Sequence, residues 1–236
     1  MNLKSFGCSF IFGTELADAN DGTTSLAPVP SCVTWPAKLA GHLKYKYECY
    51  ARPGSGNLQI LEQILNQASV SNSLDLFVIG WTWIDRFDYY NPEYNPKDKT
   101  IPWSTIMPID ESDLAKMYYR DLHSEYRDKF TCLSYIKLAI DTLNQKGIPF
   151  IMTYMDELLF DQQWHTSQAT ADLQQYIKPC MTKFEDQSFL DWSRNHGYPE
   201  TEAWHPLEDA HHAAGDYMIK VFDKQNIIGL GPSTLV

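Results

Sequence analysis

The sequence predicts one α/β domain, residues 1–236, built on a parallel β-sheet. Leu74–Gly80 and Ile148–Tyr154 are short and almost wholly apolar, as strands buried on both faces of a parallel sheet are. Around them lie stretches whose apolar residues recur at helical spacing. The chain has 236 residues, of which 44% are hydrophobic, and this is ample for a sizeable core.

Charge and cysteine content narrow the classes of function. A net charge of −11 argues against a groove that tracks nucleic-acid phosphates. No apolar run approaches the length of a membrane span, and the N-terminus lacks the form of a signal peptide, so we expect a cytoplasmic protein without a membrane partner. Five widely spaced cysteines without a CxxC pair indicate reduced thiols rather than a disulfide framework or a zinc site. Nothing in the sequence indicates a cofactor.

The stretch Lys4–Gly13 predicts a strand that stops at a tight turn, Gly7-Cys8-Ser9. Ligands bind at the carboxyl ends of strands in open α/β sheets. A serine at that place can expose its hydroxyl and point its backbone N–H into the cleft, which suits a nucleophile. The alternative is a buried first strand with an ordinary serine in its loop. We expect the Cys8 side chain to point away from the cleft.

A loop, a helix and an edge strand follow. Residues 19–31 are rich in Asn, Asp, Gly, Ser, Thr and Pro, which marks a loop. Thr34 can cap a helix that carries Pro36 in its first turn. Lys44–Ala51 has aromatic residues at strand-like density and predicts the edge strand.

A glycine-rich turn, Arg52–Asn57, precedes a helix with an apolar stripe. A turn of this kind can cradle a phosphate, although the lysine of a P-loop is missing. It can also be a generic tight turn, or it can supply an oxyanion donor from Gly56. After Leu74–Gly80, the stretch 81–86 places polar residues near the expected cleft, or else it packs its tryptophans on the core.

The middle of the chain is less regular. Residues 87–109 are rich in aromatic residues and proline and predict a functional lid or an insertion. Asp110 can cap a helical hairpin or one long bent helix that runs to Gln145. A second insertion, residues 156–199, predicts irregular helical pieces, and the stretch 189–192 fits either a fifth strand or a helix.

His205 lies just before the last predicted helix, with Pro206 suited to its first position. A loop histidine can reach a nucleophile, and Glu202 can hold its other ring nitrogen. The alternatives are a histidine with a structural hydrogen bond and a metal site made with Asp209 and His212. The missing His-Glu-x-x-His order argues against the metal.

Together these stretches resemble the SGNH/GDSL hydrolase superfamily, which implies a flavodoxin-like three-layer α/β/α sandwich. Short blocks of that family occur in order. They fall at Gly7-Cys8-Ser9 with Gly13, at Gly54-Ser55-Gly56-Asn57, at Gly80-Trp81-Thr82-Trp83 and at Glu202-Ala203-Trp204-His205-Pro206, with His211 as the family's second histidine. The paired tryptophans and Arg86 resemble a divergent branch of the kind associated with phage and bacterial genomes.

The resemblance implies a catalytic Ser9, His205 and Glu202, or a Ser-His dyad without the glutamate. It implies an oxyanion hole from the N–H groups of Ser9 and Gly56, with Gly54 as the alternative glycine, and from the hydroxyl of Thr82. The family has aspartate where this chain has Cys8 and Glu202, and asparagine where it has Thr82. Asn57, Trp81, Trp83 and Arg86 are the expected substrate-binding residues.

The implied reaction is ester hydrolysis through an acyl-enzyme, with no metal and with a small-molecule or carbohydrate ester as partner. Two alternatives use the same fold. One is a binding module that has lost turnover, in which cleft aromatics stack on sugar rings or acyl chains. The other is an acyltransferase with the same catalytic residues.

Overall fold

Four parallel strands form the central sheet in the order β2-β1-β3-β6. The computed structural model describes residues 1–20, 22, 28–91 and 103–225. The register pairs Leu3 with Tyr47, Ser5 with Val78, and Ile79 with Met152. In chain order the elements are β1 (Asn2–Phe6), α1 (Ser9–Phe12), α2 (Trp35–Leu43), β2 (Lys46–Cys49), α3 (Asn57–Val70), β3 (Leu76–Trp81), β4 (Phe87–Tyr90), β5 (Trp103–Ile106), α4 (Asp113–Met117), η1 (Tyr118–Leu122), α5 (Glu125–Lys146), β6 (Phe150–Tyr154), η2 (Glu157–Phe160), α6 (Gln168–Ile177), η3 (Lys178–Cys180), α7 (Phe189–Asn195) and α8 (Glu208–Gln225).

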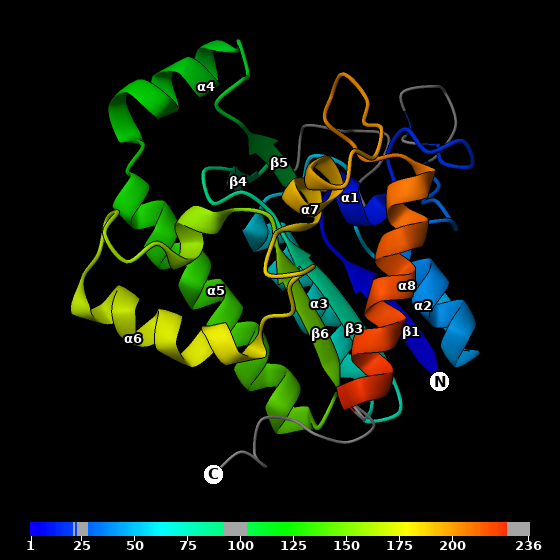
Figure 1. The fold of residues 1–236 in the computed structure, drawn as a ribbon. Coiled ribbons are helices and arrows are strands. Elements are labelled where there is room, and N and C mark those ends of the chain that lie inside the picture. The colour runs from blue at the N-terminus through cyan, green and yellow to red at the C-terminus, as the bar shows by residue number, and fades with distance from the viewer. Residues whose placement is uncertain (21, 23–27, 92–102, 226–236) are drawn as a thin grey trace.

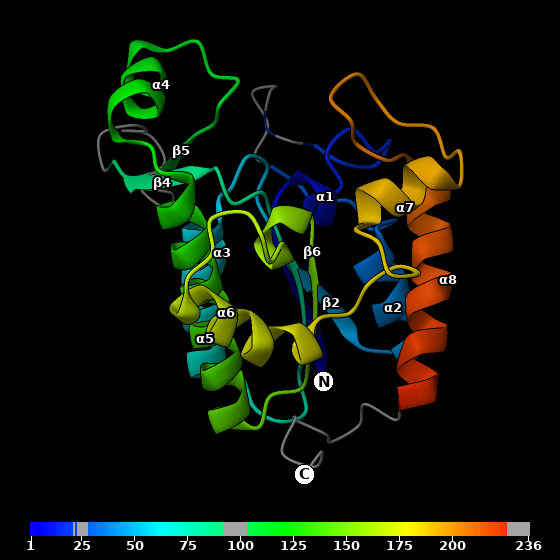
Figure 2. The ribbon, with the colours of Figure 1, turned by 60° about the vertical axis from the view of Figure 1, so that its left-hand side comes forward.

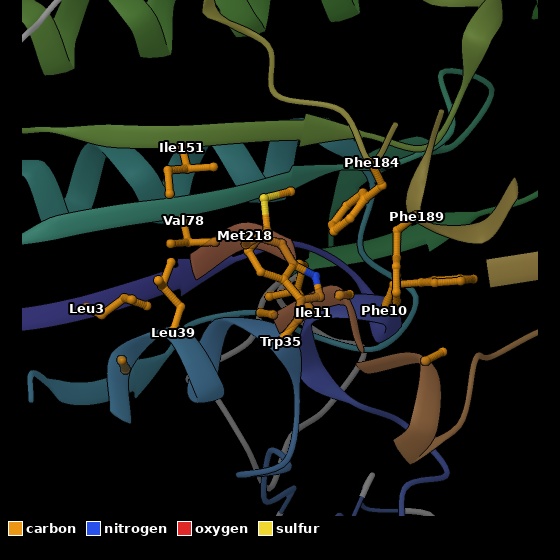
Figure 3. Packing of buried hydrophobic residues seen from close by; sticks show 14 of the residues in the cluster. Leu3, Phe10, Ile11, Trp35, Leu39, Val78, Ile151, Phe184, Phe189 and Met218 are labelled. Atoms are coloured by element: carbon orange, nitrogen blue, oxygen red, sulfur yellow. The ribbon is translucent and has the colours of Figure 1, made fainter. Parts of the chain in front are cut away.

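One helical layer packs on each face of the sheet, because successive residues of a strand point to opposite faces. Leu76 and Val78 of β3 face one layer, which contains α2, α7 and α8, and Figure 3 shows part of this core. Phe77 and Ile79 face the other layer, with α3, α5 and α6. Figure 2 shows the two layers on either side of the strands. The predicted three-layer α/β/α sandwich with a parallel sheet is confirmed.

The ends of the helices differ from the prediction in three places. Ser112, not Asp110, caps α4 by accepting a hydrogen bond from the N–H of Ala115, because Asp110 accepts one from Met107 instead. The helical stretch that follows breaks at residues 123–124, so α5 is a separate helix with Ser124 as its cap. Pro206 is not the first residue of α8, since it forms a β-bridge with Glu200 before that helix begins.

The two predicted insertions join the fold differently. Residues 87–90 and 103–106 pair as an antiparallel hairpin, β4–β5, and 92–102 lie outside the described residues. In 156–199 the undecided stretch is helical, as part of α7. Phe189 and Trp192 of α7 are buried in the core beside α2 and α8, so this segment completes a layer rather than lying outside it.

The chain goes to opposite faces of the sheet after β1 and after β3. In open α/β folds ligands bind in the crevice at such a point, where the two strands end. Figure 1 shows α1 at this end, together with the hairpin and the loop between α7 and α8. The glycines Gly7 and Gly80 allow the side chain of Ile11 to pack directly on both strand ends. A Cβ on either would lie 2.5 Å or 2.7 Å from Cγ1 of Ile11. This contact fixes α1 over the crevice.

Candidate active site

Ser9 is the first residue of α1, at the predicted turn after β1. Gly13 ends this helix in the left-handed conformation, with φ +80°, and its N–H donates to the carbonyl of Ser9 at 2.8 Å. Ser9 is 6% exposed. Within the described part of the chain, neither its hydroxyl nor its N–H has a hydrogen-bond partner. The side chain of Cys8 is buried in the core, as expected.

His205 lies beside α1, in the loop before α8. Its ring packs edge-on against Phe10, the residue after Ser9, with 5.2 Å between the ring centroids. Nδ1 of His205 lies 2.5 Å from Oε2 of Glu15, and the hydroxyl of Thr201 donates to the same oxygen at 2.7 Å. That hydroxyl in turn accepts the N–H of His205 at 3.2 Å. The histidine side chain is 15% exposed.

The carboxylate beside His205 is therefore not the one that the sequence predicts. Glu202 lies in an exposed turn, and Nδ1 of His205 is taken by Glu15. Local sequence has no signal for this pair, because 190 residues separate its members. The second histidine of the motif, His211, is 2% exposed and accepts the N–H of Trp35 through Nδ1. Burial lowers the pKa of His211 to about 3, so it is neutral at physiological pH.

The N–H of Gly56, predicted as an oxyanion donor, is already occupied. It donates to Oδ1 of Asp88 on β4 at 3.0 Å. The same carboxylate accepts the N–H and the side-chain amide of Gln59 and the hydroxyl of Thr105, at 3.0, 2.9 and 2.6 Å. Asp88 thus caps the N-terminal end of α3, where the helix dipole favours a negative charge. In this state Gly56 has no N–H to offer an oxyanion.

Asn57 is a structural clamp rather than a substrate ligand. It is 2% exposed, its Oδ1 accepts the N–H of Thr82 at 2.9 Å, and its Nδ2 donates to the carbonyls of Thr82 and Trp83. Nδ2 also lies 3.3 Å from Sγ of Cys132, whose thiol pKa is raised to about 12 by burial. The amide joins the start of α3 to the loop after β3, and both its oxygen and its nitrogen are engaged in hydrogen bonds within the protein.

The other expected site residues divide between core and crevice. Trp81 is fully buried in the core beneath α3 and α5, which contradicts a role in substrate binding. Trp83 is half-buried and packs edge-on against Phe10, 5.5 Å between centroids. The Arg86 guanidinium lies 5.0 Å from the centre of the Trp83 ring and donates to the carbonyl of Ser55. The hydroxyl of Thr82 is buried and has no partner among the described residues.

A cavity of about 1000 Å³ opens between the glycine-rich turn and the β4–β5 hairpin. It is bounded by Phe12 of α1 and by Gly54, which is left-handed with φ +77° and has open space where a Cβ would stand. Tyr89 and Trp103 contribute aromatic rings to its wall. Ser55, Gln59, Ser104, Thr105 and Ser112 contribute neutral polar side chains, and Arg52, Asp110 and Glu111 contribute charged ones.

The described side chains form no metal site at the positions that the sequence offered. Within the described ranges, no three side chains from His, Cys, Asp or Glu gather closely enough to hold a metal ion, so His205, Asp209 and His212 form no such site. Among the helices described, none is both long and apolar enough to cross a bilayer.

Comparison of the sequence with protein-family models and with curated proteins found no match. Solved structures do match. A lipolytic G-D-S-L family protein from Veillonella parvula aligns with TM-score 0.52 and 11% identity over 95% of this chain and 99% of its own. A psychrotrophic esterase from Pseudoalteromonas aligns with TM-score 0.51 and 8% identity over 95% and 98%. An acetyl xylan esterase from Butyrivibrio proteoclasticus aligns with TM-score 0.50 and 12% identity over 96% and 64%. The chain therefore has the fold of the SGNH hydrolases.

Proposed function

We propose that the protein is a serine hydrolase of the SGNH superfamily that cleaves ester bonds, with Ser9 as nucleophile and His205 as general base. The observation that carries the proposal is the arrangement around α1. Ser9 begins this helix where β1 and β3 end, and its hydroxyl has no partner among the described residues. The ring of His205 packs on the next residue, and within the same part of the chain only its Nδ1 is engaged. The fold shared with an esterase and with a lipolytic G-D-S-L protein agrees with it.

The reaction follows from these groups. Oγ of Ser9 attacks the ester carbonyl while Nε2 of His205 takes its proton, and the same nitrogen returns the proton to the leaving alcohol. Water then cleaves the acyl-enzyme with His205 again as base. The N–H of Ser9 is the first oxyanion donor. The candidates for a second donor are the N–H of Gly54 and the hydroxyl of Thr82, and Gly56 joins them only when Asp88 moves away.

The cavity beside the glycine-rich turn favours a small or carbohydrate ester as substrate. Aromatic rings stack on the apolar faces of sugars, and neutral hydroxyl and amide groups bond their hydroxyls. Tyr89 and Trp103 supply the rings, and Gln59 and Ser104 are among the polar groups. We propose this class of ester as the partner of the site.

Labelling with a fluorophosphonate tests the nucleophile. The probe should label wild-type protein at Ser9 alone, as located by mass spectrometry of the labelled peptide. Ser9→Ala should abolish labelling, and His205→Ala should reduce it by roughly 10³-fold or more, because the serine loses its base. Ser55→Ala is the matched control, since Ser55 is also a buried serine just before or at the start of a helix, yet its hydroxyl donates to the carbonyl of Arg52. Labelling at Ser55, or labelling that survives in Ser9→Ala, would contradict the proposal.

A second candidate is a binding module without turnover. The hydrogen bond from Gly56 to Asp88 favours it, because this contact occupies a donor that the reaction would use. In that case folded wild-type protein takes up no fluorophosphonate, yet calorimetry detects binding of an acetylated oligosaccharide, and Trp103→Ala weakens this binding. Labelling of Ser9 would eliminate this candidate.

A further inference from the structure

We propose that Glu15, and not Glu202, is the positioning carboxylate of His205. The inference rests on the proposed hydrolase function and names the residue that orients its base. It also changes the order of the three groups along the chain to serine, glutamate, histidine, with the glutamate only six residues after the nucleophile. Ser9 and Glu15 would then both belong to the short segment that follows β1.

The hydrogen bonds define which ring nitrogen carries the proton. An ionised carboxylate can only accept, so Nδ1 of His205 must donate its hydrogen to Oε2 of Glu15 across their 2.5 Å separation. Nε2 is then the unprotonated nitrogen with a free lone pair. A general base for Ser9 needs this tautomer, and the negative charge of Glu15 also stabilises the imidazolium that forms during attack.

Thr201 makes the carboxylate part of a closed network. Its hydroxyl donates to Oε2 of Glu15 at 2.7 Å and accepts the backbone N–H of His205 at 3.2 Å. Its backbone N–H donates to the carbonyl of His205 at 3.0 Å, and its carbonyl accepts the N–H of Trp204. One threonine therefore holds both the histidine and the carboxylate, which fixes the position of each relative to the other.

Two residues at the pair, Glu15 itself and the neighbour of His205, have a backbone conformation that residues other than glycine rarely adopt. Glu15 has φ +69° and Trp204 has φ +66°. Non-glycine residues keep such angles only when their surroundings enforce them, and they gather at functional sites. A further contact, from the N–H of Ala17 to Oε1 of Glu208 at 2.9 Å, joins the loop after α1 to the start of α8. Figure 1 shows these two segments at the same end of the sheet.

Glu202 has the spacing expected of the triad acid but not the position. It lies in an exposed turn, whereas the hydroxyl of Thr201 and Nδ1 of His205 in the same loop both bond to Oε2 of Glu15. Glu202 is thus a matched control in the same loop: it has the same side chain and charge, but among the described contacts the ring of His205 bonds to Glu15 and not to Glu202.

The first measurement is the second-order rate constant for fluorophosphonate labelling of Glu15→Gln and Glu202→Gln beside the wild type. Glu15→Gln should lose roughly 10²-fold or more, because the neutral amide neither enforces the tautomer nor stabilises the imidazolium. Glu202→Gln should stay within about twofold of the wild type. Equal losses in both variants, a loss in Glu202→Gln alone, or no loss in either would overturn the proposal. Melting temperatures check that both variants are folded.

The second measurement reads the tautomer directly and needs no activity. The ¹⁵N chemical shifts of the imidazole, assigned with His205→Gln, should give protonated Nδ1 and unprotonated Nε2 in the wild type and in Glu202→Gln at neutral pH. Glu15→Gln should give a mixture of tautomers. A wild-type ring protonated on Nε2 would overturn the role of Glu15 even if Glu15→Gln does not fold. If the ring has the expected tautomer but Ser9 takes no label, the result contradicts the proposed hydrolase function and leaves the pairing of Glu15 with His205 intact.

Discussion

The two sides of the crevice are built in opposite ways. On the base side, which comprises Glu15, Thr201, Trp204 and His205, a partly exposed hydrogen bond between a histidine and a carboxylate is flanked by left-handed backbone. On the donor side, which comprises Gly56, Asn57, Thr82 and Asp88, the polar groups lie buried and almost all of them bond to one another. In the proposed reaction the base side therefore offers an oriented histidine, whereas on the donor side the N–H of Gly56 is already occupied by Asp88.

In the proposed reaction, this difference places control on the donor side. A transition state gains from donors that are oriented but unoccupied, and the loss of one costs about 3 kcal/mol. The Asp88 carboxylate uses the N–H of Gly56 for stability instead. Turnover then depends on the donors that Asp88 does not cover, or on movement of the β4–β5 hairpin that carries it.

Asn57→Ala should have the largest effect on stability. The substitution leaves the N–H of Thr82 and the carbonyls of Thr82 and Trp83 buried without partners, which should lower the free energy of unfolding by about 3 kcal/mol or more. Urea denaturation measures this. Asn66→Ala, at an exposed position of the same helix, is the control and should change stability little. An effect no larger than that of the control would show that the donor side is not held by this clamp.

Asp88→Ala should destabilise the protein and yet speed the labelling of Ser9. Four hydrogen bonds are lost, which should cost about 2–3 kcal/mol once water replaces part of them. At the same time the N–H of Gly56 becomes available to an oxyanion. Labelling rates, taken well below the melting temperature, should rise relative to the wild type.

Glu62→Gln is the matched control for Asp88→Ala. Oε2 of Glu62 accepts the indole N–H of Trp103 at 2.6 Å, so this variant also weakens the contact between α3 and the hairpin but leaves Gly56 covered. It should lose stability without faster labelling. Equal rates in the wild type and Asp88→Ala would mean that Gly56 does not serve the reaction.

The buried histidine behind the base side should make the protein sensitive to acid. The pKa of His211 is lowered to about 3, against about 6.5 in an unfolded chain, so the unfolded state binds the extra proton between these values. Stability is unaffected above pH 7 and falls as the pH drops below about 6.5, by about 2–3 kcal/mol at pH 4.5. Urea denaturation at pH 7 and pH 4.5 measures the difference.

His211→Gln isolates this contribution, because the amide oxygen can still accept the N–H of Trp35. Burial raises the pKa of Asp85 and of Asp156, which acts in the opposite direction as the pH falls, so the informative quantity is wild type minus variant. The variant should lose clearly less stability between pH 7 and pH 4.5. Equal losses would mean that His211 is not kept neutral in the folded protein.

Local patterns predict the sheet and most of its helices. Buried residues form continuous apolar runs in the central strands, and they recur along one stripe of each helix. They also predict where Ser9 and His205 lie, at the turn after β1 and in the loop before α8, whereas the catalytic roles of both residues stay predictions. Glu15 and Asp88 have no such pattern. Glu15 depends on a left-handed residue and on a contact across 190 positions, and Asp88 on a hairpin within an irregular segment. The roles first given to Asn57 and Trp81 fail for a related reason, because their burial comes from distant helices.

Thr82→Val should have the smallest effect on stability and is the sharpest test of the donor side. The Thr82 hydroxyl is buried without a partner among the described residues, so replacing it with a methyl group should leave stability unchanged or raise it by up to about 1 kcal/mol. Thr105→Val is the control, because its hydroxyl donates to Asp88 and its loss should destabilise the protein. If the Thr82 hydroxyl stabilises an oxyanion, labelling of Ser9 falls roughly 10²-fold in the stable variant. A natural protein would keep an unpaired buried hydroxyl at a cost in stability for such a role, and unchanged labelling would leave the N–H groups of Ser9 and Gly54 as the donors.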